Sequence, residues 1–185
     1  VKVLNAVKIS GRTQNGLGVG IFNAITEKTE AIIKNYNTND SRKEVVEPLS
    51  NYNILVVDKQ FNKNSSVSLI NTNVTRSGSF RDANVTAGLI NLIDKANVYN
   101  LQGNIKMSHI NDYDYTENGF SGGIEFNDIE GKHRYGLEYR FADDKFDIND
   151  MGIQRRNNYS SVSANYMYRI FEPTEKLNNL SCTKC

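Results

Sequence analysis

The chain has 185 residues, a formal net charge of +1 and a hydrophobic content of 38%, which suits one domain with only moderate apolar material for a conventional core. A charge so close to neutral provides no field that would attract nucleic acid, so no polyanionic partner is expected. No apolar run approaches the roughly 20 residues that a membrane-spanning helix needs, and residues 1–13 lack the pattern of a signal peptide. These observations exclude a helical membrane protein but not a membrane barrel.

The composition favours strands. The chain contains 10 Tyr, 8 Phe and 13 Gly but only 2 Pro, and aromatic residues are enriched in β-sheets. Asn-rich stretches such as NYNTND supply turn chemistry between the apolar segments. We therefore predict an all-β protein.

Alternation of apolar and polar residues, the signature of a half-buried strand, recurs along the chain. It predicts about nine strands. A helix of a turn or two is conceivable only at residues 27–35, and we do not predict one. In chain order the predicted strands are Lys2–Thr13, Leu17–Thr26, Asn51–Phe61, Ser65–Thr75, Asn84–Ile93, Asn97–Ile110, Gly119–Asn127, Lys132–Phe141 and Ser160–Phe171.

The alternation is clearest in the strands predicted at residues 97–110, 132–141 and 160–171. In the first of these, Tyr99, Leu101 and Ile105 lie on one face, whereas Gln102 and Lys106 lie on the other. Each such strand therefore has one apolar side and one polar side that faces water.

The predicted connections alternate between short and long. The short ones are residues 15–16, 62–64, 94–96 and 128–131, and the long ones are residues 27–50, 76–83, 111–118 and 142–158. The short links are hairpin-sized, and Asn15-Gly16 is a strong hairpin signal because both residues tolerate positive φ. All short turns then fall at one end of an antiparallel meander, as in bacterial outer-membrane barrels.

This asymmetry leads us to predict part of a transmembrane β-barrel. Lipid satisfies no backbone hydrogen bonds, so such a sheet must close on itself, and its lipid-facing side must be apolar. Nine strands cannot close a typical bacterial barrel, which has an even number. We expect residues 1–179 to form a partial barrel domain that needs further strands, or a partner chain, for closure. Residues 180–185 then read either as a disordered or artefactual tail or as the start of another strand.

Three stretches carry a resemblance to a known family: Lys8–Thr26, Pro48–Phe61 with Ser66–Val74, and Phe146–Tyr159. They resemble the C-terminal outer-membrane barrel domain of an uncharacterised Bacteroidota family. In that family the barrel usually follows a domain similar to family-9 carbohydrate-binding modules. The resemblance implies a Gram-negative outer-membrane location and an association with carbohydrate, and it implies no catalytic residues.

The loop DDKFDINDMGIQRRNNY at residues 143–159 is the candidate site. Its carboxylates could gather around calcium, which prefers oxygen ligands, although Met151 stands where the EF-hand pattern needs one. Paired carboxylates could also serve glycoside hydrolysis, but no aromatic sugar platform lies beside them. In the third reading the acids cap turns while the two arginines pair with neighbouring acids. The candidate residues are Asp143, Asp144, Asp147, Asp150, Arg155 and Arg156.

Other motifs carry little chemistry. Cys182 and Cys185 form a C-x-x-C without the strand-to-helix context of a redox site. His109 and His133 lie on apolar faces of different predicted strands and lack further zinc ligands. The GLGVG at residues 16–20 precedes a strand instead of a helix, so we interpret it as part of a hairpin and not as a phosphate-binding loop. We therefore expect no metal, no cofactor and no enzymatic activity.

The function predicted from the sequence is passive. A polar, charge-lined interior would act as a channel, or as a surface scaffold, for a polar small molecule or a saccharide. The lipid bilayer of the outer membrane is the expected partner. A soluble up-and-down barrel or sandwich that binds a ligand is the alternative, because a period of two does not show which way the apolar face points.

Overall fold

The computed structural model describes residues 2–36, 39–170 and 180–184. All regular structure in these residues is β. Ten strands form one antiparallel sheet in the order β1-β2-β5-β6-β7-β8-β9-β10-β11-β12, and β3 and β4 form a separate hairpin. The strands are β1 (Val3–Arg12), β2 (Leu17–Thr26), β3 (Thr29–Lys34), β4 (Ser41–Glu47), β5 (Ser50–Phe61), β6 (Ser65–Arg76), β7 (Asp82–Ile93), β8 (Tyr99–Asn111), β9 (Thr116–Asp128), β10 (His133–Ala142), β11 (Tyr159–Ile170) and β12 (Leu180–Lys184).

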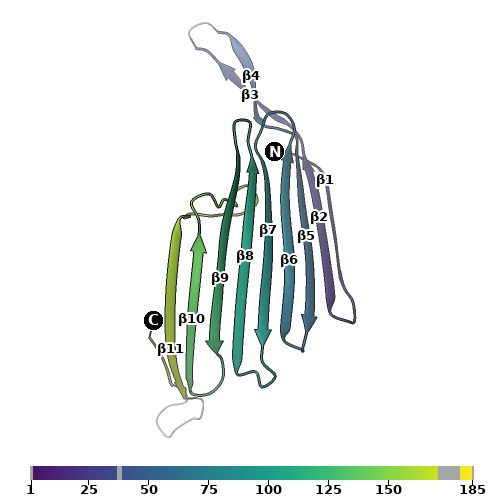
Figure 1. Ribbon diagram of the computed structural model, residues 1–185. Coiled ribbons are helices and arrows are strands. Elements are labelled where there is room, and N and C mark those ends of the chain that lie inside the picture. The colour runs from purple at the N-terminus through teal and green to yellow at the C-terminus, as the bar shows by residue number, and fades with distance from the viewer. Residues whose placement is uncertain (1, 37–38, 171–179, 185) are drawn as a thin grey trace.

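The predicted meander of antiparallel strands is confirmed. Each of the nine predicted segments overlaps one strand of the large sheet, and neighbouring strands in the chain pair with each other except where the β3–β4 hairpin intervenes (Figure 1). Within the described residues the sheet is open, since β1 pairs only with β2 and β12 pairs only with β11. Leu180–Lys184 form a strand that pairs with β11, which agrees with the reading of this segment as the start of another strand and not with the disordered tail.

Two other expectations require correction. Residues 27–50 contain the β3–β4 hairpin, which projects beyond the ends of the large sheet (Figure 1). The connections 77–81 and 112–115 are as short as the turns at the opposite end, so two of the four connections predicted to be long are short, and those between β2 and β5 and between β10 and β11 are long. Strands β6 to β9 extend one to three residues into the predicted loops, where most residues are polar and the alternation of apolar and polar residues disappears.

Turn chemistry fixes the register of the hairpins. Asn62 and Lys63, with φ of 47° and 64°, both adopt the left-handed conformation in the β5–β6 turn, as a tight hairpin turn requires. Beyond this turn β5 and β6 pair without interruption from Phe61↔Ser65 to Ser50↔Arg76. Because the side-chain period of a strand is two, this register determines which residues share a face.

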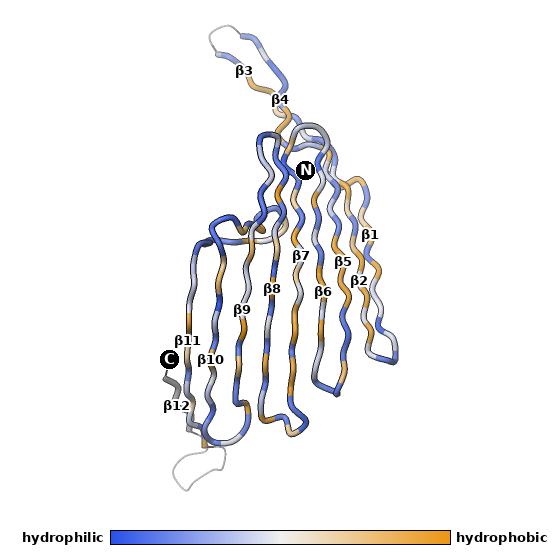
Figure 2. The backbone as a smooth tube through the Cα atoms, in the orientation of Figure 1, coloured by the Kyte–Doolittle hydropathy of each residue, from blue (hydrophilic) through white to orange (hydrophobic). Residues whose placement is uncertain are grey.

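One side of the sheet is the apolar face. Directly paired residues point to the same side, and the row Val57, Leu69, Gly88, Ile105, Gly122 and Phe141 crosses the sheet from β5 to β10. The parallel row one level nearer the short turns contains Val67, Ile90, Gly103, Ile124, Tyr139 and Val162. Along the strands the apolar residues alternate with hydrophilic ones (Figure 2).

The opposite side is the polar face. Its charged and amide residues on β8 to β10 include Gln102, Lys106, Glu125, Glu138 and Arg140. Arg12 of β1 also reaches this face and hydrogen-bonds to Asp58 of β5 at 2.5 Å, passing over Gly18 of the intervening strand. The polar side chains therefore contact one another laterally along the sheet.

Candidate functional site

The connection between β10 and β11, residues 143–158, folds back across the polar face; we call it the inner loop. Phe146 at its start is only 4% exposed. Ile148 and Met151 lie against Val74 of β6 and Ala83 of β7, both of which are buried. The main-chain N–H of Asp147 donates a hydrogen bond to Oγ of the buried Ser108 on β8 at 3.1 Å. The inner loop thus covers strands β6 to β9 instead of extending away from the sheet.

Gly119 of β9 permits this close approach. A Cβ atom at this position would lie 2.2 Å from the main-chain nitrogen of Phe146, and main chain cannot move aside cheaply. Asp143 anchors the loop at the same place, because its carboxylate accepts hydrogen bonds from the main-chain N–H groups of Phe120 and Phe146, each at 2.7 Å. The base of the inner loop is therefore fixed to β9.

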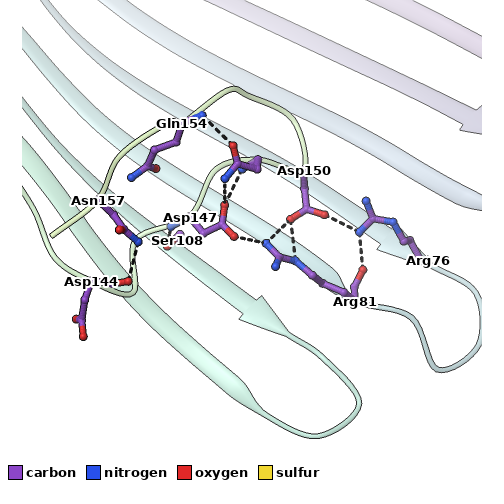
Figure 3. Close-up of polar contacts among 9 residues, drawn as sticks. Arg76, Arg81, Ser108, Asp144, Asp147, Asp150, Gln154 and Asn157 are labelled. Carbon is purple, nitrogen blue, oxygen red and sulfur yellow. Dashed lines mark hydrogen bonds and ion pairs between the residues drawn. The ribbon is translucent and has the colours of Figure 1, made fainter.

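Two arginines from the neighbouring region hold the middle of the inner loop (Figure 3). Arg81 precedes β7 and donates to Asp147 Oδ2 at 2.7 Å and to Asp150 Oδ2 at 2.8 Å. Arg76, the last residue of β6, forms an ion pair with the other oxygen of Asp150 at 2.8 Å. The Asp150 side chain is only 11% exposed, so water screens these bonds less than it screens an ordinary surface pair. We call these four residues the arginine clamp.

The clamp alters the titration of its members. Burial alone would raise the pKa of Asp147, but the hydrogen bond from Arg81 and those from Asn149 outweigh burial and lower that pKa below its usual value. Burial would likewise lower the pKa of Arg81, yet its hydrogen bonds to Asp147 and Asp150 raise that pKa above the ordinary value. Both directions favour the charged pair.

The six candidate residues do not form one cluster. Asp147 and Asp150 meet at Arg81, Asp143 caps the base of the loop, and Asp144 is exposed. Within the residues that the structure describes, Arg155 and Arg156 form no ion pair, so the expectation that they pair with neighbouring acids is wrong. Asp147 and Asp150 are paired instead with Arg76 and Arg81, which are not among the six candidate residues.

A signal for the clamp was nevertheless present in the sequence. The meander places the β6–β7 and β10–β11 connections at the same end of the sheet, and one carries arginines where the other carries aspartates. What the sequence does not reveal is that the inner loop folds over the polar face, which depends on Gly119 and Ser108.

The inner loop also encloses a polar hollow of about 260 Å³. The residues that line it include three with side-chain amides, Asn149, Gln154 and Asn157, and three cationic ones, Lys145, Arg155 and Arg156. Nε2 of Gln154 donates to the main-chain oxygen of Arg156 at 3.1 Å. Oε1 of the same side chain is buried without a hydrogen-bond partner among the described residues.

His109 and His133 pair with other side chains, and Cys185 of the C-x-x-C lies outside the described residues. Nδ1 of His109 lies 2.7 Å from Oδ1 of Asn118, and Nδ1 of His133 lies 2.5 Å from the hydroxyl of Tyr166. Among the described residues, no group of three or more His, Cys, Asp or Glu side chains could hold a metal ion. The same part of the chain contains no helix long and apolar enough to cross a membrane.

The architecture defined so far is an all-β antiparallel meander with one long loop folded over its polar face. The chain belongs to the family described as "Domain of unknown function (DUF5916)", which matches residues 1–184. No curated protein and no solved structure matches the chain.

Proposed function

We propose that the chain forms part of the wall of a β-barrel in the outer membrane, with its apolar face toward lipid and its polar face toward a water-filled interior. One observation carries this proposal. The large apolar side chains that are exposed in the middle of β5 to β11 lie on the apolar face. They include Leu55, Leu69, Ile90, Ile105, Ile124, Leu137 and Val162.

The exposed band is continuous and without charge. In the described strands the charged residues of this face, such as Lys59, Asp82 and Asp128, lie at strand ends. Water-soluble monomers rarely expose contiguous apolar patches beyond a few hundred Å². On β8 the apolar positions run from Tyr99 to Met107, about 26 Å along the strand, which is on the scale of the apolar band of outer-membrane barrels.

Aromatic side chains gather where this band ends at the short turns of β8 to β11. Tyr99 stacks on Phe126 with ring centroids 5.7 Å apart, and Phe126 lies 6.3 Å from Tyr135. His133 contacts the rings of Tyr166 and Tyr168. Aromatic girdles of this kind mark the membrane–water interface in barrels.

The opposite end of the apolar face is built differently. Asn23 donates to Asn51 and Asn53 at 2.6 and 2.8 Å, and Asn71 donates to Asn84 and to a neighbouring threonine. These uncharged amides lie between the apolar band and the connections that include the β3–β4 hairpin. In the proposed orientation this end extends into the exterior head-group region. Partners for the free edges of β1 and β12 complete the barrel, which acts as a passive channel or binding scaffold for a polar solute.

Spin labels on adjacent residues test the orientation of the faces. Ile124→Cys and Glu125→Cys are made in the full protein with Cys182 and Cys185 replaced by serine, and each is labelled and reconstituted in phosphatidylcholine vesicles. We expect the label at residue 124 to collide with oxygen, which partitions into lipid, and the label at residue 125 to collide with an aqueous nickel chelate. A label at residue 124 shielded from both reagents would favour a soluble barrel with an apolar interior and overturn the proposal.

A further inference from the structure

We propose that the polar hollow in the inner loop is a binding site for an anionic solute that also carries hydroxyl groups. This inference rests on the proposed function, because it names the class of polar solute that the polar face receives. Three observations carry it: two arginines without ionic partners among the described residues, one buried acceptor without a donor, and the fixed position of the inner loop.

Charge provides the first argument. Two of the acids around the hollow already have ionic partners. Asp147 pairs with Arg81, and Oε1 of Glu117 lies 3.7 Å from Nζ of Lys145. Arg155 and Arg156 form no ion pair with any described residue. Two adjacent guanidinium groups present N–H donors in the planar arrangement that carboxylate, phosphate and sulfate accept. Of the charged residues around the hollow that have no ionic partner among the described residues, two are arginines and one is the exposed Asp144, so a ligand there meets a net positive charge.

The orphaned acceptor provides the second argument. Oε1 of Gln154 is buried and has no partner among the described residues, while Nε2 of this side chain is held by the main-chain oxygen of Arg156. A buried carbonyl oxygen without a donor is costly, so such groups usually meet a donor from water or a ligand. A simple anion has no hydrogen to donate, whereas a hydroxyl group does. The ligand that satisfies both features is an anion with hydroxyl groups.

The rigidity of the inner loop provides the third argument. The arginine clamp and the contact at Gly119 fix both the middle and the base of the loop. Oδ1 of Asn149 accepts from the main-chain N–H of Gln154 at 2.8 Å, and Nδ2 of Asn157 donates to the main-chain oxygen of Asp144 at 2.7 Å. A site held in this way loses little freedom when a solute binds, which favours affinity.

Titration calorimetry on the full protein in detergent tests the site with D-glucuronate as the probe, and with D-glucose and inorganic sulfate, an anion without a hydrogen to donate, as comparison ligands. We expect glucuronate to bind more tightly than either, with an affinity that falls as salt increases. Arg155→Gln with Arg156→Gln is expected to weaken glucuronate binding at least about tenfold, since charge-assisted hydrogen bonds are lost. Arg42→Gln, on the exposed β3–β4 hairpin, is the matched control and should leave the affinity unchanged.

Gln154→Met separates the two halves of the proposal. It removes the acceptor at nearly constant size, so it should weaken glucuronate binding and leave sulfate binding unchanged. Absence of glucuronate binding, equal binding of glucose, or full affinity in the double arginine variant would overturn the inference. Because binding is measured in detergent, these outcomes are independent of the spin-label result on the orientation of the faces.

Discussion

The two faces of the large sheet come from the same strands, but they differ in how much of each face the rest of the chain covers. On the apolar face the central side chains remain exposed, with Val162 at 71% and Ile105 at 60%. On the polar face the inner loop covers the ends of β6 to β9 and buries Val74 completely. The long loop therefore lies over the face that carries the charges, and no described residue covers the middle of the apolar face. This difference supports the proposal that lipid covers the apolar face.

The same charge placed on each face at neighbouring residues tests whether the two faces have different environments. Val162 and Ser163 are both exposed on β11 and point to opposite sides. If lipid covers the apolar face, Val162→Lys places a cation near the middle of the bilayer and should cost about 2–4 kcal/mol of unfolding free energy. Ser163→Lys faces Glu138 and should cost almost nothing. Urea unfolding of the reconstituted protein measures both, and equal costs would show that the faces share one environment.

Removing Arg81 probes how firmly the polar face holds its cover. Arg81→Met keeps the length of the side chain but leaves Asp147 without an arginine partner, whereas Asp150 keeps Arg76. The loss of these partly buried charged hydrogen bonds should cost about 1–3 kcal/mol. Hydrogen exchange in residues 143–158 should accelerate while exchange in β7 and β8 stays slow.

Arg155→Met is the control for this variant, because Arg155 forms no ion pair among the described residues. Its stability should stay within about 0.5 kcal/mol of the wild type. If the two variants behaved alike, the clamp would not be what holds the inner loop on the polar face.

A smaller effect is expected from Gly119→Ala. The new methyl group would meet the main chain at Lys145 and Phe146, so the base of the inner loop must move outward, at a cost of about 1–2 kcal/mol typical of overpacking. Faster exchange of the Phe146 and Asp147 amides would report this displacement. Gly11→Ala on β1 has nothing within 4 Å of the new atom and should be neutral or slightly stabilising. Unchanged exchange in the Gly119 variant would contradict the close contact.

The sequence predicted the strands better than the loops for a physical reason. Where one face is apolar, as in β8 from Tyr99 to Met107, a period of two is enough to identify the strand and its faces. The alternation fails where Asn71, Thr72 and Asn73 succeed one another, although this stretch of β6 pairs with both neighbours. The strand predicted at residues 65–75 nevertheless includes this stretch. The prediction missed the short strand extensions at Arg76 of β6, Asp82 of β7 and Thr116 of β9, which carry no apolar pattern. In β3 the adjacent Ile32 and Ile33 interrupt the alternation, so the β3–β4 hairpin was not predicted.

The candidate site shows the same limit in another form. Its position in residues 143–158 was evident from composition, because acids, amides and arginines crowd there. The partners of the acids were not evident, since Arg76 and Arg81 are 66 or more residues away in the chain. Only the direction in which the inner loop folds brings them together, and that direction is set by tertiary contacts at Ser108 and Gly119.

The gentlest perturbation of the polar face is a change of pH. The pKa of Asp147 in the folded chain is lower than usual, because the hydrogen bonds from Arg81 and Asn149 outweigh burial. The stabilisation from this group is therefore complete above the unfolded value of about 3.9 and is lost as pH falls through the lower folded value. Protection of the inner loop from hydrogen exchange, corrected for intrinsic rates, should stay constant from about pH 8 to 5 and decline below about pH 4. Asp147→Asn should lower protection at neutral pH and flatten the acid decline, whereas an equally steep decline in this variant would assign the titration to another group.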